Sequence, residues 1–162
     1  MKKQFPMLAA TLLLAALAGC ATPQSQPKTV ADTAAAHPQL ATLSRLLDQA
    51  GLAPTLRGSG PYTVFAPSDE AFRALPAAEL QALAGDRERL KELLSYHVLP
   101  TRTASSEVGV GSAKTVQGGE VALSRAGSFV TVEDAMVTQA DVAAANGVVH
   151  VIDRVLMPPK KK

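Results

Sequence analysis

The apolar residues between positions 40 and 50 recur with a helical period, which predicts an amphipathic helix with one face on a core. The repeating positions are Leu40, Leu43, Leu46, Leu47 and Ala50. Gly51 follows them as a stop signal. After Gly58-Ser59-Gly60-Pro61 breaks the chain, the β-rich run from Tyr62 to Ala66 predicts a short buried strand that ends at Pro67.

Cap residues predict three more helices between this strand and residue 97. Ser68 is a good N-cap, and Asp69 and Glu70 then fall in the first turn, where the helix dipole favours negative charge. Pro76 suits the first position of a second helix that Gly85 closes. Asp86 is the predicted cap of the third.

The third of these helices carries a histidine on its apolar face. Leu90, Leu93, Leu94 and His97 fall at i, i+3, i+4 and i+7. We therefore expect His97 to be buried rather than exposed and reactive. A buried neutral imidazole needs partners for its ring nitrogens, so a polar group should lie within hydrogen-bond reach.

The second half of the chain, from Lys114 to Leu156, has short Val-rich runs separated by Gly and Asn, which is typical of antiparallel strands. Gly118-Gly119 and Ala126-Gly127 are turn candidates. The run from Val148 to Ile152 is apolar on both faces except at His150, which predicts a central strand and a core histidine. Helices first and strands later indicate an α+β fold.

Charge and candidate chemistry exclude several functions. Six of the 16 basic residues lie outside residues 29–158, which leaves 10 basic and 14 acidic residues there, a net charge of −4. A basic footprint for nucleic acid is therefore missing from the sequence. The three histidines, His37, His97 and His150, stand in no metal-binding or triad pattern, and the loop glycines lack the context of a phosphate loop. We expect neither an enzyme nor a metal or cofactor.

The N-terminus predicts export. Lys2 and Lys3 precede an apolar run from Met7 to Leu17, which is too short to span a bilayer and indicates a signal peptide. The run ends in Leu17-Ala18-Gly19-Cys20, which resembles the lipobox of bacterial lipoproteins. The resemblance implies cleavage after residue 19 and acylation of Cys20; the alternative is ordinary cleavage that leaves a free thiol. Ala21 at the next position favours the outer membrane of a Gram-negative cell.

The rest of the chain divides into a tether, one domain and a tail. Residues 20–28 lack large apolar side chains and predict a flexible tether. Residues 29–158 are enough for a single domain with a core. Residues 159–162 form a basic tail; it is either solvated or in contact with anionic lipid or lipopolysaccharide.

Three segments resemble the motifs of a fasciclin domain. They are Thr63-Val64-Phe65-Ala66-Pro67-Ser68-Asp69-Glu70-Ala71-Phe72, the pair Tyr96-His97, and Asn146-Gly147-Val148-Val149-His150-Val151-Ile152-Asp153. Their order and spacing match the family over residues 29–158. The resemblance implies a wedge-shaped β-sandwich with helices packed along one side. It also implies that the motif residues, Phe65, Pro67, Asp69, Phe72, Tyr96, His97, Asn146, Gly147, His150 and Asp153, are structural.

Some animal fasciclin proteins recognise integrins through an Asp followed by an apolar residue. Asp141 and Val142 occupy the matching place, but their flanking residues differ. We expect Asp141 to be exposed near a strand end and to hydrogen-bond the backbone of a turn just ahead of Asn146-Gly147; an adhesive role for Asp141 and Val142 is the alternative.

Three functions then compete. The first is a noncatalytic envelope lipoprotein that binds an envelope or extracellular protein or polysaccharide, which predicts a flat exposed patch. The second is a periplasmic small-ligand or envelope-stress binding protein, which predicts a concave apolar pocket between helices and sheet. The third is an enzyme, which would need His97 or His150 exposed beside an acid or nucleophile.

Overall fold

A computed structural model describes residues 28–159, in which all the α-helices and one strand precede the remaining strands, and the predicted α+β class is confirmed. The predicted signal peptide and Cys20 lie outside the described residues, as do most of the tether and tail. In chain order the elements are α1 (Val30–Ala36), α2 (Ala41–Ala50), α3 (Ala53–Leu56), β1 (Tyr62–Pro67), α4 (Asp69–Arg73), α5 (Ala77–Gly85), α6 (Arg87–Tyr96), β2 (Val98–Leu99), η1 (Ser105–Glu107), β3 (Gly111–Lys114), β4 (Glu120–Ala126), β5 (Phe129–Val132), β6 (Ala135–Ala144) and β7 (Gly147–Ile152).

The helix boundaries follow the sequence signals closely. Gly51 ends α2 in the left-handed conformation, with φ of 72°. Ser68 accepts a hydrogen bond from the backbone N–H of Ala71, and Asp86 accepts bonds from the N–H groups of Glu88 and Arg89, so both predicted caps are confirmed. Pro76 differs by one position: its ψ of 133° is extended, so it is the N-cap of α5 rather than its first helical residue.

The seven strands form one continuous order, β2-β1-β7-β6-β5-β4-β3. Every neighbouring pair is antiparallel except β1 and β7, which are parallel over six residue pairs. The predicted antiparallel strands are confirmed in the second half, but the parallel pairing of β1 with β7 lies between distant segments and no local signal predicted it. It places β7 centrally, as expected from its apolar run.

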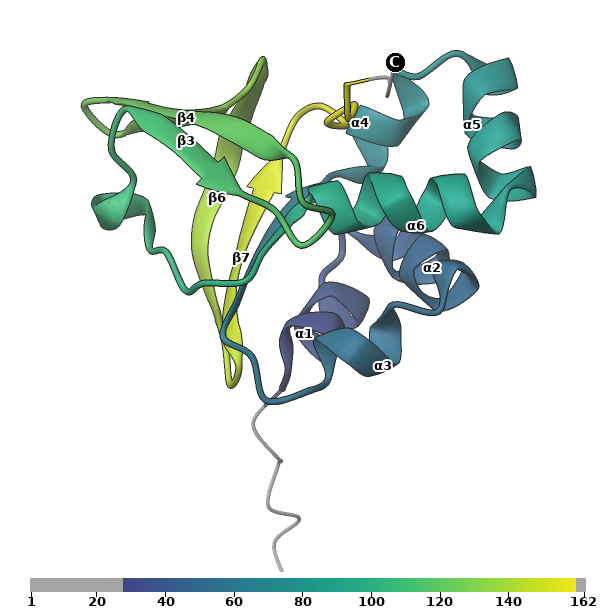
Figure 1. The fold of residues 1–162 in the computed structure, drawn as a ribbon, viewed down its shortest axis with the longest axis horizontal. Helices are drawn as coiled ribbons and strands as arrows, with labels where there is room; N and C mark the ends of the chain where they lie inside the picture. Colours follow the sequence, from purple (N-terminus) through teal and green to yellow (C-terminus); the bar gives the residue numbers. More distant parts are fainter. Residues whose placement is uncertain (1–27, 160–162) are drawn as a thin grey trace, which may run out of the picture.

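The strand order curls back on itself into a near-barrel. The ten-residue strand β6 pairs with β5 and β7 and has two register shifts against β7, where bulges bend it. Beyond β3, the backbone N–H of Val116 donates to the carbonyl of Val98 in β2 at 2.8 Å, so the two ends of the strand order meet there. Figure 1 shows this strand layer beside the helices, which cover one side.

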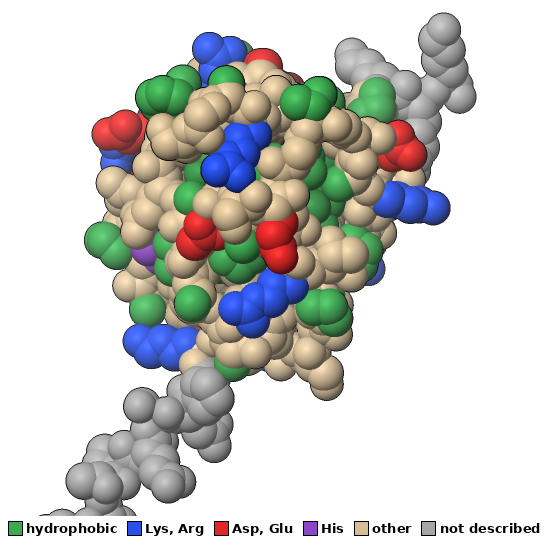
Figure 2. Space-filling view, turned by 90° about the vertical axis from the view of Figure 1, so that its left-hand side faces the viewer, with side chains coloured by type: hydrophobic (Ala, Val, Ile, Leu, Met, Phe, Trp, Pro, Cys, Tyr) green, Lys and Arg blue, Asp and Glu red, His purple; other side chains and the backbone are tan. Residues whose placement is uncertain are grey.

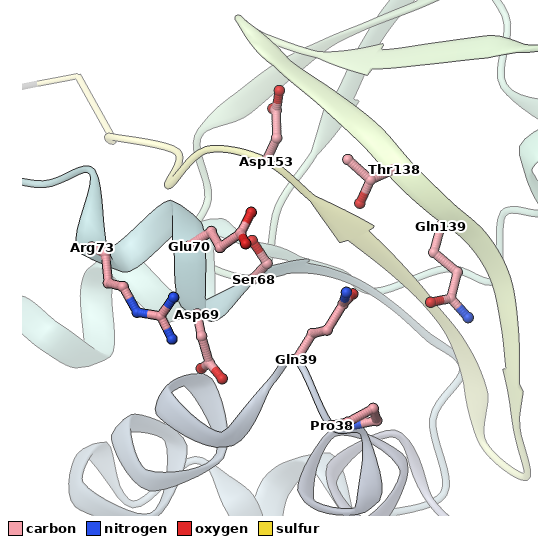
Figure 3. A pocket seen from close by; sticks show the side chains of 9 residues that line it. All are labelled: Pro38, Gln39, Ser68, Asp69, Glu70, Arg73, Thr138, Gln139 and Asp153. Atoms are coloured by element: carbon pink, nitrogen blue, oxygen red, sulfur yellow. The ribbon is translucent and has the colours of Figure 1, made fainter.

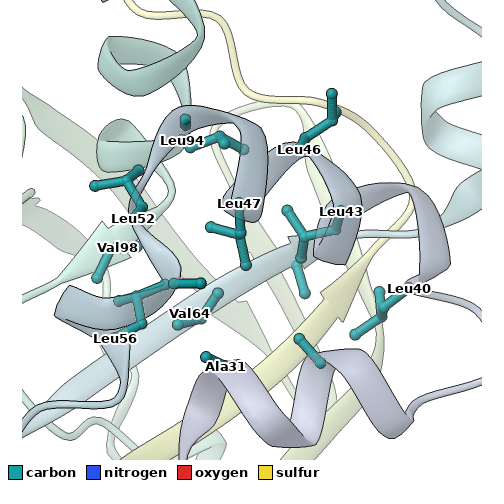
Figure 4. Close-up of a cluster of buried hydrophobic side chains, with 14 of the residues drawn as sticks. Ala31, Leu40, Leu43, Leu46, Leu47, Leu52, Leu56, Val64, Leu94 and Val98 are labelled. Atoms are coloured by element: carbon teal, nitrogen blue, oxygen red, sulfur yellow. The ribbon is translucent and has the colours of Figure 1, made fainter. Parts of the chain in front are cut away.

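Strands β1 and β7 separate two clusters of buried side chains. Val64 and Val149 face the helical cluster, which includes the predicted face of α2 (Figure 4). Phe65 and Ile152 face the opposite way, into the strand layer, with Val121 and Val132. Because both faces are covered, both strands are apolar over nearly their whole length. The sandwich with helices along one side, implied by the resemblance, is confirmed.

Candidate interaction site

The first motif ties two helices together. Phe65 and Phe72 are fully buried in the core. Asp69 lies in the first turn of α4, and its Oδ1 accepts a hydrogen bond from the N–H of Thr42 at 2.8 Å. Helix α2 has no cap of its own, because its N-cap residue is Leu40. Asp69 therefore caps α2 from 27 residues away.

The charge of Asp69 is favoured by this contact. Partial burial works against the charged carboxylate, but the hydrogen bonds from Thr42 and the nearby Arg73 guanidinium together lower the pKa of Asp69 below its ordinary value. The carboxylate is thus held ionised at the start of two helices, α2 and α4, whose dipoles both favour negative charge.

The central Tyr96-His97 pair is buried, as predicted. His97 is 1% exposed; its Nδ1 donates to the carbonyl of Leu93 at 2.8 Å, and its Nε2 accepts from the N–H of Leu156 at 2.9 Å. The sequence predicted hydrogen-bond partners for this ring but did not identify them. Burial lowers the pKa of His97 to about 4, against the opposing effect of the Leu93 carbonyl. His97 is therefore neutral and joins the end of α6 to the C-terminal segment.

Tyr96 is a second cross-link. Its hydroxyl donates to the carbonyl of Glu120 in β4 at 2.8 Å. Burial and the neighbouring Glu133 carboxylate raise the pKa of Tyr96. The ring packs inside the strand layer with Leu99 and Val121. Tyr96 thus fixes α6 to the β3–β4 hairpin.

The closing motif begins with a side chain that joins three segments. The Oδ1 atom of Asn146 accepts from the N–H of Val30 at 2.8 Å, and its Nδ2 donates to the carbonyls of Leu56 and Gly58 at 2.8 and 2.6 Å. Gly147 follows where β7 meets β1 closely. A Cβ there would lie against the Tyr62 carbonyl oxygen, 2.8 Å from its carbonyl carbon. Only glycine fits this contact without a backbone shift.

His150 and Asp141 meet at a bulge in β6. His150 is 1% exposed and stacks on Phe65, with ring centroids 5.7 Å apart. Its Nδ1 accepts from the N–H of Asp141 at 3.1 Å, so its Nε2 carries the proton and donates to the carbonyl of Thr103 at 2.9 Å. The predicted core position of His150 is confirmed.

Asp141 departs from the expected turn role. It is exposed, as predicted, but it lies inside β6 with φ of 57°, and its carboxylate accepts from the N–H and hydroxyl of Ser105. The predicted bonding to a turn ahead of Asn146 is wrong, because the β6 bulge aims Asp141 at η1 instead. These bonds outweigh burial and lower the pKa of Asp141. Val142, beside it, is half-buried against the helical core.

This cluster does not make a nucleophile. The Ser105 hydroxyl donates to the Asp141 carboxylate and not to a base, while both nitrogens of His150 bond backbone groups. A hydrolase triad needs the imidazole between serine and carboxylate. Within residues 28–159, moreover, no group of three or more His, Cys, Asp or Glu side chains is placed to hold a metal ion.

Asp153, the last motif residue, borders a groove between the helices and the strands. Its Oδ1 accepts from the N–H of Met136 at 2.7 Å, which pins the end of β7 to the start of β6. The groove has a volume of about 600 Å³. Its walls come from the α1–α2 connection, α4, β6 and the residue after β7: Pro38, Gln39, Ser68, Asp69, Glu70, Arg73, Thr138, Gln139 and Asp153 (Figure 3).

Sequence analysis singled out only part of this groove. Ser68, Asp69 and Asp153 belong to the motifs, but Gln39, Thr138 and Gln139 are exposed polar residues on unrelated elements. The α1–α2 connection reaches the groove because the backbone N–H of Asp69 donates to the carbonyl of Gln39 at 2.8 Å. No local pattern marks these three residues, since only the tertiary packing brings them together.

The arrangement is that of an α+β domain in which buried and hydrogen-bonded motif residues hold the fold together. A family model for the fasciclin domain matches residues 38–158, so the chain belongs to the fasciclin domain family. Members of this family are generally noncatalytic proteins of the adhesion type. The motif resemblance predicted from the sequence is therefore confirmed.

Two relatives are similar to this chain over most of its length. The chain is 41% identical over 135 residues to the pig (Sus scrofa) transforming growth factor-beta-induced protein ig-h3, a match that covers 83% of this chain and 20% of that protein. It is 38% identical over 135 residues to the cell surface glycolipoprotein MPB83 of Mycobacterium bovis, which covers 80% and 60% of the two chains. The chain thus spans about a fifth of the first relative and under two thirds of the second.

A solved structure shares the fold. The FAS1 domain pair of the insect cell adhesion molecule fasciclin I superposes with a TM-score of 0.66 at 16% identity, over 81% of this chain and 51% of that one. The identity is low, so this likeness supports the fold alone.

Cys20, the predicted lipidation residue, lies outside the described part of the chain. Between residues 28 and 159, no helix has the length and apolar character needed to cross a bilayer.

Proposed function

We propose that this chain is a noncatalytic cell-envelope lipoprotein that binds a protein or polysaccharide partner through its fasciclin domain. One observation carries the proposal: an exposed apolar patch on the outer face of the strand layer. Phe129 is 62% exposed and Met136 is 44% exposed. Thr131 lies between them, two residues from Phe129 in β5 and directly opposite Met136 in β6, so the three side chains share one face.

The patch is modest in size. Figure 2 shows the strand side of the molecule, where hydrophobic side chains form separate small areas among charged ones. Ser124 and Ala126 of β4 pair with Thr131 and Phe129 and extend the uncharged surface. A small apolar centre with a polar surround suits a transient interface rather than an obligate one.

The small-ligand alternative fits the groove less well. That hypothesis predicts an apolar pocket between helices and sheet, but the groove there is lined mainly by charged, amide and hydroxyl side chains. The enzyme alternative requires an exposed catalytic histidine, whereas both His97 and His150 are 1% exposed and hydrogen-bonded to backbone. The interaction function is therefore the one that these observations favour.

The proposed anchor is the acylated Cys20. Two or three acyl chains would hold the protein on a membrane almost permanently, because each buried methylene contributes about 0.8 kcal/mol. The relative MPB83 is by name a cell surface glycolipoprotein, which supports the same arrangement here. Residues 20–28 would then serve as the tether and residues 29–158 as the presented domain, with Ala21 favouring the outer membrane. Cys20→Ser should move the protein from the membrane fraction to the soluble fraction; retention of the variant would refute the anchor.

A pull-down from envelope extract tests the interaction. Residues 29–162 are immobilised through an N-terminal tag that takes the place of the tether, and the variant Phe129→Ser with Met136→Ser is compared with Val116→Ser with Met157→Ser. Each pair removes two exposed large apolar side chains, but the second pair lies outside the patch. A saturable partner should be lost with the patch variant and kept with the control. Equal capture by both variants would rule out this face as the interface.

A further inference from the structure

The groove between α4 and β6 has a charge balance that selects its ligand. Three carboxylates border it, Asp69, Glu70 and Asp153, against one guanidinium, Arg73, so the lining has a net charge of −2. Such a lining repels anionic ligands and attracts cationic ones. Its residues are different from those of the apolar patch, so the groove is a separate surface.

Several lining side chains are already held in place by a hydrogen bond to one polar atom, while a second polar atom is available to a ligand. Gln139 uses Oε1 against His37 at 3.1 Å, which leaves its Nε2. Ser68 accepts from Ala71, which leaves its hydroxyl proton. Asp153 uses Oδ1 against Met136, which leaves Oδ2. Since these side chains are ordered before binding, a ligand does not have to immobilise them.

Two further side chains project into the groove with their polar groups unused. Figure 3 shows the carboxylate of Glu70 and the carboxamide of Gln39 pointing into the space between α4 and β6, opposite Thr138. Neither side chain makes a hydrogen bond to another group in residues 28–159. The groove therefore offers a free carboxylate beside a free amide, which can pair with a basic side chain and with a peptide backbone respectively.

The lining also favours a peptide ligand over a sugar. No aromatic side chain borders the groove, so it lacks the apolar ring face against which a sugar ring would pack. A peptide needs no such face, because alternating backbone donors and acceptors match amide and hydroxyl groups. From the charge, the fixed polar atoms and this lining, we propose that the groove binds a basic, Arg- or Lys-bearing peptide segment of a partner protein.

Fluorescence anisotropy with a defined probe tests the proposal. The probe is a fluorescein-labelled Gly-Arg-Ser-Arg-Gly peptide, added to the full chain in a neutral detergent at low salt. Glu70→Gln with Asp153→Asn should raise Kd at least tenfold, because both charges are removed while the Asp153 contact to Met136 is retained. Arg73→Gln should lower Kd about threefold. A peptide with citrulline in place of both arginines should lose most of its affinity.

The matched control is Asp48→Asn with Glu88→Gln. Both acids are exposed and outside the groove, and the pair changes the net charge by the same amount. Its Kd should stay within twofold of the wild-type value. Equal weakening by both double variants would overturn the proposal, since overall charge would then explain the binding. A second result would also overturn the proposal: the wild type binds a neutral oligosaccharide and not the peptide, and the groove variant loses the oligosaccharide. Should the groove variant fail to fold, an unchanged or raised Kd for Arg73→Gln alone would overturn it.

Discussion

Replacing His97 by Leu should both destabilise the fold and remove a dependence of its stability on pH. Leu has about the volume of His but no ring nitrogens. The change leaves the N–H of Leu156 and the carbonyl of Leu93 without their partners at 2.9 and 2.8 Å. A buried donor left unsatisfied costs about 1–3 kcal/mol, so we expect the free energy of unfolding at pH 7.5 to fall by about 2–3 kcal/mol.

The size of the substituent separates hydrogen bonding from packing. His97→Ala makes the same two bonds impossible and also leaves a cavity at a site that is 1% exposed. Large-to-small changes in a core cost about 2–5 kcal/mol. His97→Ala should therefore be more destabilising than His97→Leu by about 1–2 kcal/mol. Urea unfolding followed by circular dichroism measures both values.

The pH effect follows from the lowered pKa of His97. In the unfolded chain the imidazole has its ordinary pKa of 6.5, and in the fold it has a pKa of about 4. Between these values the unfolded state binds more protons, so the free energy of unfolding falls as pH drops from 6.5 to 4. The loss reaches about 3 kcal/mol, at 1.36 kcal/mol per pH unit. Above pH 6.5 this contribution is complete.

Comparison of the wild type with His97→Leu isolates this contribution. Asp69 and Asp141 have lowered pKa values, and their stabilisation is lost as the pH falls below their ordinary value of 3.8, outside most of the window. The difference in stability between the two proteins should therefore be constant above pH 6.5 and shrink from pH 6.5 to pH 4. A constant difference across this range would show that His97 titrates normally in the fold, and the argument from burial would be refuted.

Three further substitutions test the motif residues by urea unfolding. Gly147→Ala should lower the free energy of unfolding by about 1–3 kcal/mol or more, because its Cβ meets the Tyr62 carbonyl. Gly109→Ala, with open space around it, should be nearly neutral. Similar values for the two variants would contradict the close approach at Gly147. Asn146→Asp should cost about 2–3 kcal/mol, since it removes both donated hydrogen bonds, and a neutral effect would mean that water replaces them. Asp69→Ala should cost about 1–2 kcal/mol and Asp69→Asn less, because Asn keeps an acceptor for Thr42; the reverse order would exclude capping of α2.

Local patterns predicted the elements well because local forces determine them. The helical period of residues 40–50 and the Gly51 stop signal correspond to α2 and its left-handed cap. Ser68 and Asp86 cap their helices through contacts two or three residues away. The burial of His97 followed from its place on an apolar stripe, since the other residues of that stripe, Leu90, Leu93 and Leu94, pack in the helical core.

Contacts between distant segments were not predictable in the same way. The capping of α2 by Asp69 and the parallel pairing of β1 with β7 join residues far apart in sequence. Asp141 was assigned to a turn because Asn146-Gly147 follows it, but the bulge in β6 turns it towards Ser105. A single extra residue in a strand reverses which face a side chain takes, and no composition signal marks it.

The same contacts explain why the motifs identify the family without identifying the partner. Asp69, His97, Asn146 and His150 each bond backbone groups of other segments, so their chemistry is used within the fold. The polar atoms that these side chains use in this way are not available to a ligand. Specificity for a partner must come from exposed side chains, such as Phe129 on the strand face and Glu70 in the groove. The motif residues hold the elements that carry these side chains in place. Two fasciclin domains can therefore share every motif residue and bind different partners.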